Sequence, residues 1–345
     1  MSVTIKDVAQ KANVALSTVS RVVNNSGYVK QQTRDKVNSV IRELGYSPNA
    51  IARNLHTSRT QQIGVVVSDI TNPYFSNLVK AISEVLNGTG YGMNVCITNE
   101  SIAMEKASLE MLAENRVSGL IVTPIVETDS INNRDTLCSL SAKGFPIILV
   151  DNEVPGFSSE GVFYDNYTGA YDATKLLLQK GHRRIAIIHG SLFYKTEYDR
   201  LNGYLDAHKE ANITPVSSLQ FETNDGINGT MAIMPQLLSP KKKNATAIFC
   251  CSNTHTIGCL KFLRQNGLRI PEDIAVIGSD EIDPYEMWAQ NVSVVSQPTD
   301  ELGRIATHTL LTRIRKEQNG NPDEFSNNRI YLQPRLVLRG SEQLV

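Results

Sequence analysis

From residue 63 onwards, short and continuously apolar runs alternate with stretches of helical periodicity. The runs occupy residues 63–67, 93–97, 119–122, 147–150, 185–188, 247–250 and 274–277. Strands that are apolar at every position are buried on both faces, which is typical of parallel sheets covered by helices. About eight such units exceed one doubly wound domain, so we expect two similar lobes with a ligand cleft at the carboxyl ends of the strands.

The first part of the chain has a different pattern, that of three short helices. A first helix is indicated by apolar residues spaced along one helical face: Ile5, Val8, Ala9 and Ala12. A second helix over 15–24 has an apolar face and an opposite polar face, and a third begins near Thr33 and ends at Gly45. Two short helices joined by a tight turn at Asn13 form a helix-turn-helix, whose second helix would enter a major groove.

The charge of the chain is unevenly distributed. The first sixty residues hold nine Lys and Arg against three acids, whereas the remainder holds 25 basic residues against 32 acidic ones. A basic head on an acidic body suggests that only the head meets a polyanion. The alternative is a chance run of solvated charge.

Composition and motifs argue against several other classes of protein. The odd number of cysteines, five, argues against a disulfide framework, and we expect reduced core residues. The six histidines show no metal-ligand spacing, and we expect no metal and no cofactor. The glycine-rich residues 88–92 have the wrong spacing for a dinucleotide site, and neither a phosphate loop nor a nucleophile elbow is present, so we expect no enzyme. Without a membrane-spanning run or a signal peptide, a cytoplasmic location is expected.

Several segments of the chain, in colinear order, resemble the lactose-repressor (LacI/GalR) family. Those matching its headpiece signature are residues 3–9, 17–22, 33–34, 44–50 and 52–55. Those similar to its effector-binding core are residues 63–65, 72–75, 181–185, 200–204, 271–274 and 277–280. The resemblance implies an α/β fold class: a three-helix headpiece and a hinge helix, then a two-lobed, periplasmic-binding-protein-like core of doubly wound parallel sheets.

This resemblance also implies domain boundaries. The headpiece would span 1–47, the hinge helix and linker 48–60, and the effector-binding and dimerisation core 61–345. Within the core, the expected first lobe comprises about 61–161 and 292–320, and the expected second lobe about 162–291 and 321–340.

Three residues of the second predicted helix match positions that read base edges in family members. Leu16 and Ser17 stand at its start, and Arg21 matches an arginine for which bidentate hydrogen bonding to guanine is the usual geometry. Leu16 replaces the polar or aromatic residue common there, and it would contact only a thymine methyl or a pyrimidine edge. The alternative for Arg21 is a surface salt bridge. Phosphate contacts are implied for Thr4, Ser20, Asn24 and Thr33.

The hinge is predicted as a short helix over 49–56, because the Ser-Pro pair at 47–48 is an N-cap followed by a first-turn proline. Two turns are marginal alone, so this helix needs a partner helix or DNA. In the family, the residue matching Leu55 wedges into the minor groove at the operator centre. Ala52 would let two hinge helices approach each other, and Asn49 matches a further DNA contact. The alternative is that Leu55 packs on its own lobe.

The resemblance assigns an effector site to residues from separate segments. Asp151 and Asp280 each follow an apolar strand, and Arg200 begins a helix; the family uses these positions to bind effector hydroxyls or carboxylates. Phe75, with Tyr74 beside it, offers a ring face for a sugar or a base. The remaining matching positions are Ser252 and Gln297. The alternative for each aspartate is a turn residue that caps the next helix.

Two departures from the family pattern affect this site. Many members carry an Asn-Asp pair where this chain has Ser252-Asn253, and Ser279 replaces a common aromatic residue. The shorter Ser252 would reach its ligand through water, or the pocket would hold a larger or phosphorylated effector.

The combined expectation is a homodimeric, sequence-specific repressor of carbohydrate utilisation genes. It would bind a pseudo-palindromic double-stranded operator, would not bind a membrane, and would answer to a sugar, sugar acid or sugar phosphate between its lobes; whether that effector induces or corepresses stays open. The family's leucine-heptad tail is absent, so a dimer is expected rather than a tetramer. An alternative is a catabolite-control-type regulator whose co-effector is a phosphorylated protein. A secreted sugar-binding protein does not fit the basic headpiece.

Overall fold

The structure is a computed structural model that describes residues 3–23, 27–46, 60–127, 130–238, 245–281, 292–319 and 328–344. It divides into two units, Met1–Thr60 and Gln61–Val345, which we call the headpiece unit and the core. The predicted hinge helix lies outside the described residues, as do four of the predicted DNA contacts: Asn24, Asn49, Ala52 and Leu55.

The headpiece unit contains the three expected helices, α1 (Ile5–Ala12), α2 (Leu16–Val23) and α3 (Gln31–Leu44). Their apolar faces form one small core made of Val8, Ala9, Ala12, Val19, Val22, Val37 and Val40. Asn13 adopts a left-handed conformation with φ 49° between α1 and α2, and Gly45, with φ 62°, ends α3. The helix-turn-helix expected from the sequence is therefore confirmed, with α3 beginning two residues before the expected Thr33.

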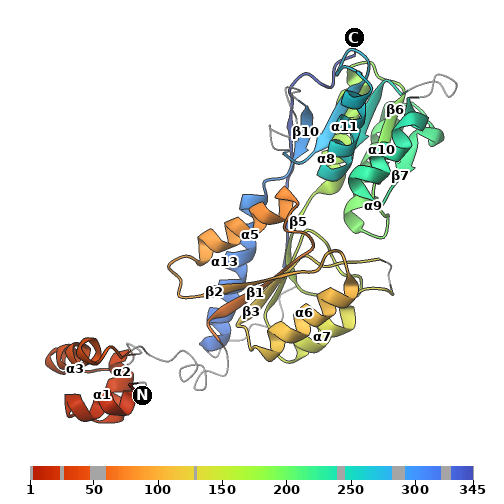
Figure 1. Cartoon of the computed structure of the whole chain (residues 1–345). Coiled ribbons are helices and arrows are strands. Elements are labelled where there is room, and N and C mark those ends of the chain that lie inside the picture. The colour runs from red at the N-terminus through yellow and green to blue at the C-terminus, as the bar shows by residue number, and fades with distance from the viewer. Residues whose placement is uncertain are drawn as a thin grey trace. The chain divides into compact units, whose positions relative to one another are not determined.

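The first lobe of the core is built on a six-stranded sheet of order β11-β5-β4-β3-β1-β2, in which every pairing is parallel. Its strands are β1 (Gln62–Val67), β2 (Gly92–Ile97), β3 (Gly119–Val122), β4 (Ile147–Val150), β5 (Glu160–Tyr164) and β11 (Arg329–Leu332). Helices α5 (Pro73–Leu86) and α13 (Thr299–Gln318) cover one face, and α6 (Ile102–Glu114) and α7 (Arg134–Ala142) cover the other (Figure 1).

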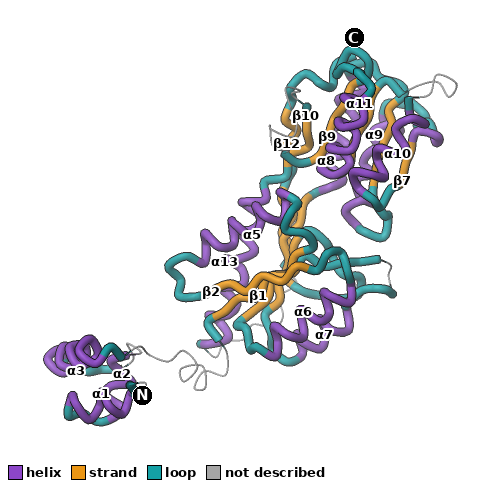
Figure 2. Tube along the Cα trace, viewed as in Figure 1, coloured by secondary structure: helices purple, strands orange, loops and turns teal. Residues whose placement is uncertain are grey.

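The second lobe repeats this architecture with a sheet of order β12-β10-β9-β8-β6-β7. Its strands are β6 (Ile185–His189), β7 (Gln220–Glu222), β8 (Ala247–Cys250), β9 (Ala275–Ser279), β10 (Ser293–Ser296) and β12 (Arg335–Val337). Only β12 is antiparallel to its neighbour among these described strands. Helices α8 (Asn166–Gln179) and α9 (Lys195–Glu210) pack on one face, and α10 (Gly226–Leu237) and α11 (Asn253–Gln265) on the other; a short 3-10 turn, η1 (Ser217–Leu219), precedes β7 (Figure 2). The expected fold class is confirmed.

The chain crosses between the two lobes three times: after β5, after β10 and after β11. These crossings correct the expected lobe boundaries. The first sheet includes all of β5, to Tyr164, whereas the first lobe was expected to end near residue 161. Strand β10 pairs in the second sheet and β11 in the first, which is the reverse of what was expected for these parts of 292–320 and 321–340. Helix α13 packs on the first sheet and β12 pairs in the second, as expected. An apolar pattern indicates that a strand is buried but does not say which of two similar sheets it joins.

The expectations about cysteines, metal sites and membrane-spanning segments can also be compared with the structure. All five cysteines are free: Cys250, Cys251 and Cys259 are buried, Cys96 is half-buried and Cys138 is exposed, so the expectation of core residues is wrong for Cys138. In the described part of the chain, no His, Cys, Asp and Glu side chains gather in a group of three or more that could hold a metal ion. None of its helices is long and apolar enough to cross a lipid bilayer.

Candidate DNA-binding and effector sites

The exposed face of α2 carries the residues predicted to read DNA. Leu16 is 45% exposed, and Ser17 and Arg21, four residues apart on one helical face, are also exposed. Arg21 makes no ion pair with any described residue, so the alternative of a surface salt bridge is not observed. Ser20 and Thr33 are half-buried.

Thr4 is the N-cap residue of α1 and is hydrogen-bonded to Asp7 in the first turn of that helix. Its backbone N–H and its hydroxyl both donate to the Asp7 carboxylate, at 2.8 Å and 2.7 Å. These hydrogen bonds lower the pKa of Asp7. A hydroxyl has one proton to donate, and that of Thr4 is already donated to Asp7. A hydrogen bond from Thr4 to a DNA phosphate would therefore replace the hydroxyl's bond to Asp7, or it would come from the backbone N–H of Thr4.

A cavity of about 760 Å³ lies in the core, with a wall drawn from both lobes. It is lined by all seven residues that the sequence suggested for the effector: Tyr74, Phe75, Asp151, Arg200, Ser252, Asp280 and Gln297. The position agrees with the physics of parallel sheets, since the cavity lies at the carboxyl ends of β4 and β9, where connecting loops carry polar side chains.

Asp151 and Asp280 occupy equivalent places in the two lobes. Each follows a strand, β4 or β9, and each has a left-handed backbone, with φ 70° and 63°. Tyr74 donates its hydroxyl proton to Asp151 Oδ1 at 2.9 Å, and Asn152 donates to Oδ2 at 3.2 Å. Asp151 therefore binds side chains of the cavity wall rather than capping a helix.

Burial weakens the acidity of both carboxyls. The pKa of Asp151 is raised by burial and partly lowered by the charge of Arg200. The pKa of Asp280 is raised to about 7 by burial, again opposed by Arg200. Asp280 Oδ1 is shielded from solvent and has no hydrogen-bond partner among the described residues, whereas the backbone N–H of Asn253 donates to the same carboxyl group and lowers its pKa.

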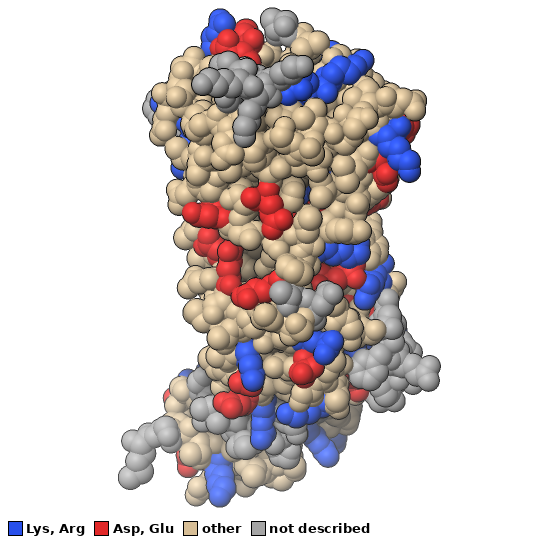
Figure 3. Space-filling view, turned by 90° about the vertical axis from the view of Figure 1, so that its right-hand side faces the viewer, with Lys and Arg blue, Asp and Glu red and all other residues tan. Residues whose placement is uncertain are grey.

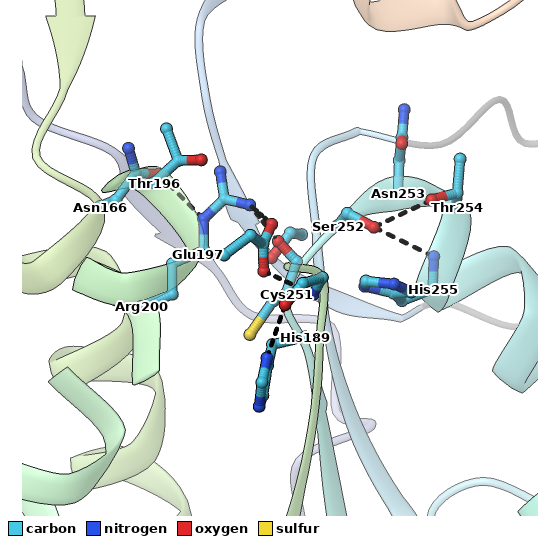
Figure 4. A network of polar contacts seen from close by, with 12 residues as sticks. Asn166, His189, Thr196, Glu197, Arg200, Cys251, Ser252, Asn253, Thr254 and His255 are labelled. Atoms are coloured by element: carbon cyan, nitrogen blue, oxygen red, sulfur yellow. Dashed lines mark hydrogen bonds and ion pairs between the residues drawn. The ribbon is translucent and has the colours of Figure 1, made fainter. Parts of the chain in front are cut away.

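Arg200 is only 8% exposed and is held by three groups, as Figure 4 shows. Its Nε donates to Asn166 Oδ1 at 2.9 Å, its terminal nitrogen pairs with Glu197 at 2.9 Å, and the same nitrogen donates to the carbonyl of Cys251. Gln297 donates to the same Asn166 oxygen at 3.0 Å. The guanidinium is thus fixed in orientation, and its charge is balanced by Glu197.

The close crossing of α8 and α9 places Arg200 beside Asn166. Gly203 faces α8, and a Cβ built on it would come 2.4 Å from the backbone oxygen of Tyr167 and 2.8 Å from the nitrogen of Tyr171. Only glycine permits this approach of two backbones. A glycine in a helix of the sequence is the signal for such a crossing, but it does not name the partner helix.

The two serines that depart from the family pattern have different environments. Ser252 caps α11: its hydroxyl accepts from His255 N at 3.2 Å and lies 3.0 Å from the hydroxyl of Thr254 (Figure 4). Ser279 is 3% exposed and donates to the carbonyl of Cys250 at 2.8 Å. It does not line the cavity, so the expectation that Ser279 alters the pocket is wrong. Its side chain points into the second lobe's own core.

Polar contacts between the lobes were not foreseen from the sequence. Asn253, which begins α11, donates to Asn72 Oδ1 at 2.7 Å, and Asn72 caps α5 in the first lobe. Thr196 donates to Asn152 Oδ1 at 3.2 Å, again from the second lobe to the first. These contacts depend on how the lobes face each other, and a single sequence carries no signal for that arrangement.

A helix-turn-helix in one unit and a cavity lined by both lobes in the other are the features of a DNA-binding regulator of the class compared below. Residues 4–49 match the model described as bacterial regulatory proteins, lacI family, and residues 174–342 match the periplasmic binding protein-like domain. The ribose operon repressor of Haemophilus influenzae is 32% identical over 342 residues, which cover 98% of each chain. The chain belongs to the lacI family.

Solved structures agree with this membership. The lac repressor dimer bound to operator and the anti-inducer ONPF superposes with a TM-score of 0.81 at 25% identity and covers both chains completely. The transcriptional regulator CelR in complex with cellobiose gives a TM-score of 0.71 at 29% identity, with 98% of this chain and 99% of that chain covered. The protein is a DNA-binding transcriptional repressor that binds operator DNA, and the expectation that it is not an enzyme is confirmed by this family membership.

Proposed function

We propose that this repressor is controlled by a small sugar that binds between the lobes of the core, and that it regulates carbohydrate utilisation genes. The observation that carries the proposal is the meeting of all seven predicted effector residues around one cavity. Its wall combines the half-buried ring of Phe75 with oriented carboxyl, amide and guanidinium groups. A ring face with few polar groups of fixed orientation suits a ligand that is apolar on its faces and hydroxylated at its edges.

The ring of Phe75 is held in place by its neighbour. Tyr74 and Phe75 make an edge-to-face contact with ring centroids 5.1 Å apart, and the hydroxyl of Tyr74 is fixed by Asp151. The wall is therefore largely preformed, which lowers the entropic cost of binding.

The same cavity supplies a physical route from ligand to operator. Residues of both lobes line it, so a ligand that bridges them favours one arrangement of the lobes by its differential affinity for the two arrangements. In a dimer, the arrangement of the lobes would decide whether two headpieces and hinge segments grip one operator. An inducer would favour the arrangement that releases DNA, and a corepressor the one that holds it.

The experiment is calorimetric titration of the full chain with individual sugars, combined with measurement of operator affinity. For the sugar that shifts operator affinity, Phe75→Ala should weaken binding by about fivefold or more, because a stacked aromatic ring contributes about 1 kcal/mol beyond its buried area. Tyr198→Ala, which removes an exposed aromatic ring outside the cavity, is the matched control. If no sugar binds and a phosphorylated protein alters operator affinity instead, the catabolite-control alternative replaces this proposal.

A further inference from the structure

The mouth of the cavity is acidic on both lobes. Its exposed lining residues include Glu100 and Glu127 from the first lobe, and Glu222 and Asp225 from the second. None of these four carboxylates forms an ion pair with a described residue. Figure 3 shows acidic side chains gathered around a hollow at mid-height on one face of the core. A cavity mouth lined by one sign of charge repels ligands of that sign.

The inner wall of the cavity has no free positive charge to offset the negative charge of the mouth carboxylates. Arg200 is the one Lys or Arg among the described residues that line the cavity, and its guanidinium is already balanced by Glu197 at 2.9 Å. A buried arginine that is paired within the protein has little charge left to offer a phosphate or a carboxylate. The described wall of the cavity thus offers no unpaired Lys or Arg to an anionic sugar.

His255 adds a requirement for a hydrogen-bond donor on the ligand. This residue lines the cavity, is 4% exposed, and has no hydrogen-bond partner at Nδ1 in the part of the chain that the structure describes. Its Nε2 lies 3.2 Å from the carbonyl oxygen of Thr223. Because a carbonyl only accepts, Nε2 carries the proton of the neutral ring, and Nδ1 is left as a buried acceptor. Burial lowers the pKa of His255, which keeps the ring neutral.

A ligand that satisfies Nδ1 must donate a hydrogen bond there. Hydroxyl and ammonium groups donate, whereas the oxygens of an ionised phosphate or carboxylate accept only. The shielded Oδ1 of Asp280, also without a partner among the described residues, imposes the same requirement whenever that carboxyl is ionised. Sugar acids and sugar phosphates also keep hydroxyls that donate, so these two acceptors call for a hydroxylated or amine-bearing ligand but do not rank it by charge. The ranking by charge rests on the carboxylates at the mouth and on the pairing of Arg200 with Glu197.

We infer that the effector site discriminates by charge: for one sugar ring, the amine-bearing form binds most tightly, the uncharged form less tightly, and the acidic or phosphorylated form least. This inference rests on the proposed function and narrows it, since it removes sugar acids and sugar phosphates from the effectors considered. Each mouth carboxylate interacts weakly through water, so we expect about a threefold change in affinity per unit of ligand charge at low salt, and less at high salt.

The test is calorimetric titration of the full chain with matched ligands. One series is glucose, glucosamine, glucose 6-phosphate and glucuronate; the others repeat it on galactose and mannose, and ribose is compared with ribose 5-phosphate. The expected order is amine, uncharged, acid. A phosphorylated or acidic form that binds as tightly as its uncharged parent, or tighter, overturns the inference and leaves the sugar-controlled repressor standing. If none of the compounds binds, both proposals are wrong.

Substitution of the mouth carboxylates tests whether they cause the preference for an amine-bearing sugar over an acidic one. The double variant Glu222→Gln, Asp225→Asn should reduce the preference of the full chain for the amine over the acidic form by about threefold or more, with a weaker dependence on salt. The control is Glu110→Gln, which removes an exposed carboxylate of α6 outside the cavity and should leave the preference unchanged. A preference that is identical in the double variant and the control contradicts the role given to the mouth carboxylates.

Discussion

Glu105 is a carboxyl group enclosed in the first lobe without a cationic partner, and it should make the stability of the core depend on pH. It is 0% exposed on α6 and accepts from the backbone N–H of Ile125 at 2.7 Å and from the amide of Asn133 at 2.8 Å. Burial raises the pKa of Glu105 from 4.5 to about 7, despite the two hydrogen bonds. Ile125 lines the effector cavity, so this carboxyl helps to hold the cavity wall.

The sign of the effect follows from the raised pKa. Below pH 4.5 the group is protonated in both the folded and the unfolded chain, so its contribution is fully favourable there. Between pH 4.5 and about 7 the unfolded chain releases the proton first, and stability is lost as the pH rises. At 1.36 kcal/mol per pKa unit, the shift amounts to about 3 kcal/mol in total, most of which falls between pH 5 and 8.

The assay is urea unfolding of the full chain and of Glu105→Gln, followed by circular dichroism at pH 5 and pH 8. Glutamine does not titrate and keeps one acceptor for two donors, so the variant should lose about 1 kcal/mol of hydrogen bonding at either pH. Relative to wild type, its free energy of unfolding should therefore rise by about 2 to 3 kcal/mol between pH 5 and 8. Glu110→Gln, on the exposed side of the same helix, should show no such rise. Equal pH dependence in wild type and Glu105→Gln would refute the reasoning.

Three further outcomes are expected. Arg21→Ala should weaken binding to the cognate operator by about 1 to 3 kcal/mol in a gel-shift assay at matched salt, with sugar binding unchanged; undiminished preference for the operator over bulk duplex would contradict base reading by α2. Gly203→Ala should lower the free energy of unfolding by about 1 to 3 kcal/mol in urea titrations because it forces α8 and α9 apart, whereas Lys209→Ala, exposed on α9, should not. Operator affinity should fall steeply between 50 and 200 mM salt, whereas the calorimetric affinity for an uncharged sugar should stay nearly constant.

Much of the fold could be predicted because its strands are buried on both faces. Residues 63–67 and 147–150 are apolar throughout, and the structure has β1 and β4 there. Strands β7 and β12 were missed because they are three residues long and lie at sheet edges, where half-exposed side chains leave no continuous apolar run. Strands β5, β10 and β11 were missed as well, because each holds only two or three consecutive apolar residues. The assignment of β10 and β11 to lobes failed for a different reason, since strand pairing is a long-range property that local periodicity does not encode.

In the candidate site, too, residues marked by a local sequence pattern could be predicted, whereas residues that depend on tertiary packing could not. Asp151 and Asp280 could be found from the sequence because a polar residue directly after a buried strand lies at the carboxyl edge of a sheet. Asn166 and Glu197, which orient Arg200, could not, because their contacts arise from the packing of α8 against α9. The unpartnered nitrogen of His255 was equally hidden, since it depends on which atom meets Thr223.

The exchange of segments between lobes has a consequence for biosynthesis. The first lobe lacks α13 and the edge strand β11 until residues 299–332 have left the ribosome, by which point most of the second lobe has been made. The first lobe thus cannot complete its fold as it leaves the ribosome. One face of its sheet stays without α13 until translation is nearly finished, and that face must be protected from aggregation during synthesis. A frameshift or nonsense mutation late in the gene would consequently damage the earliest-made lobe as much as the last-made one.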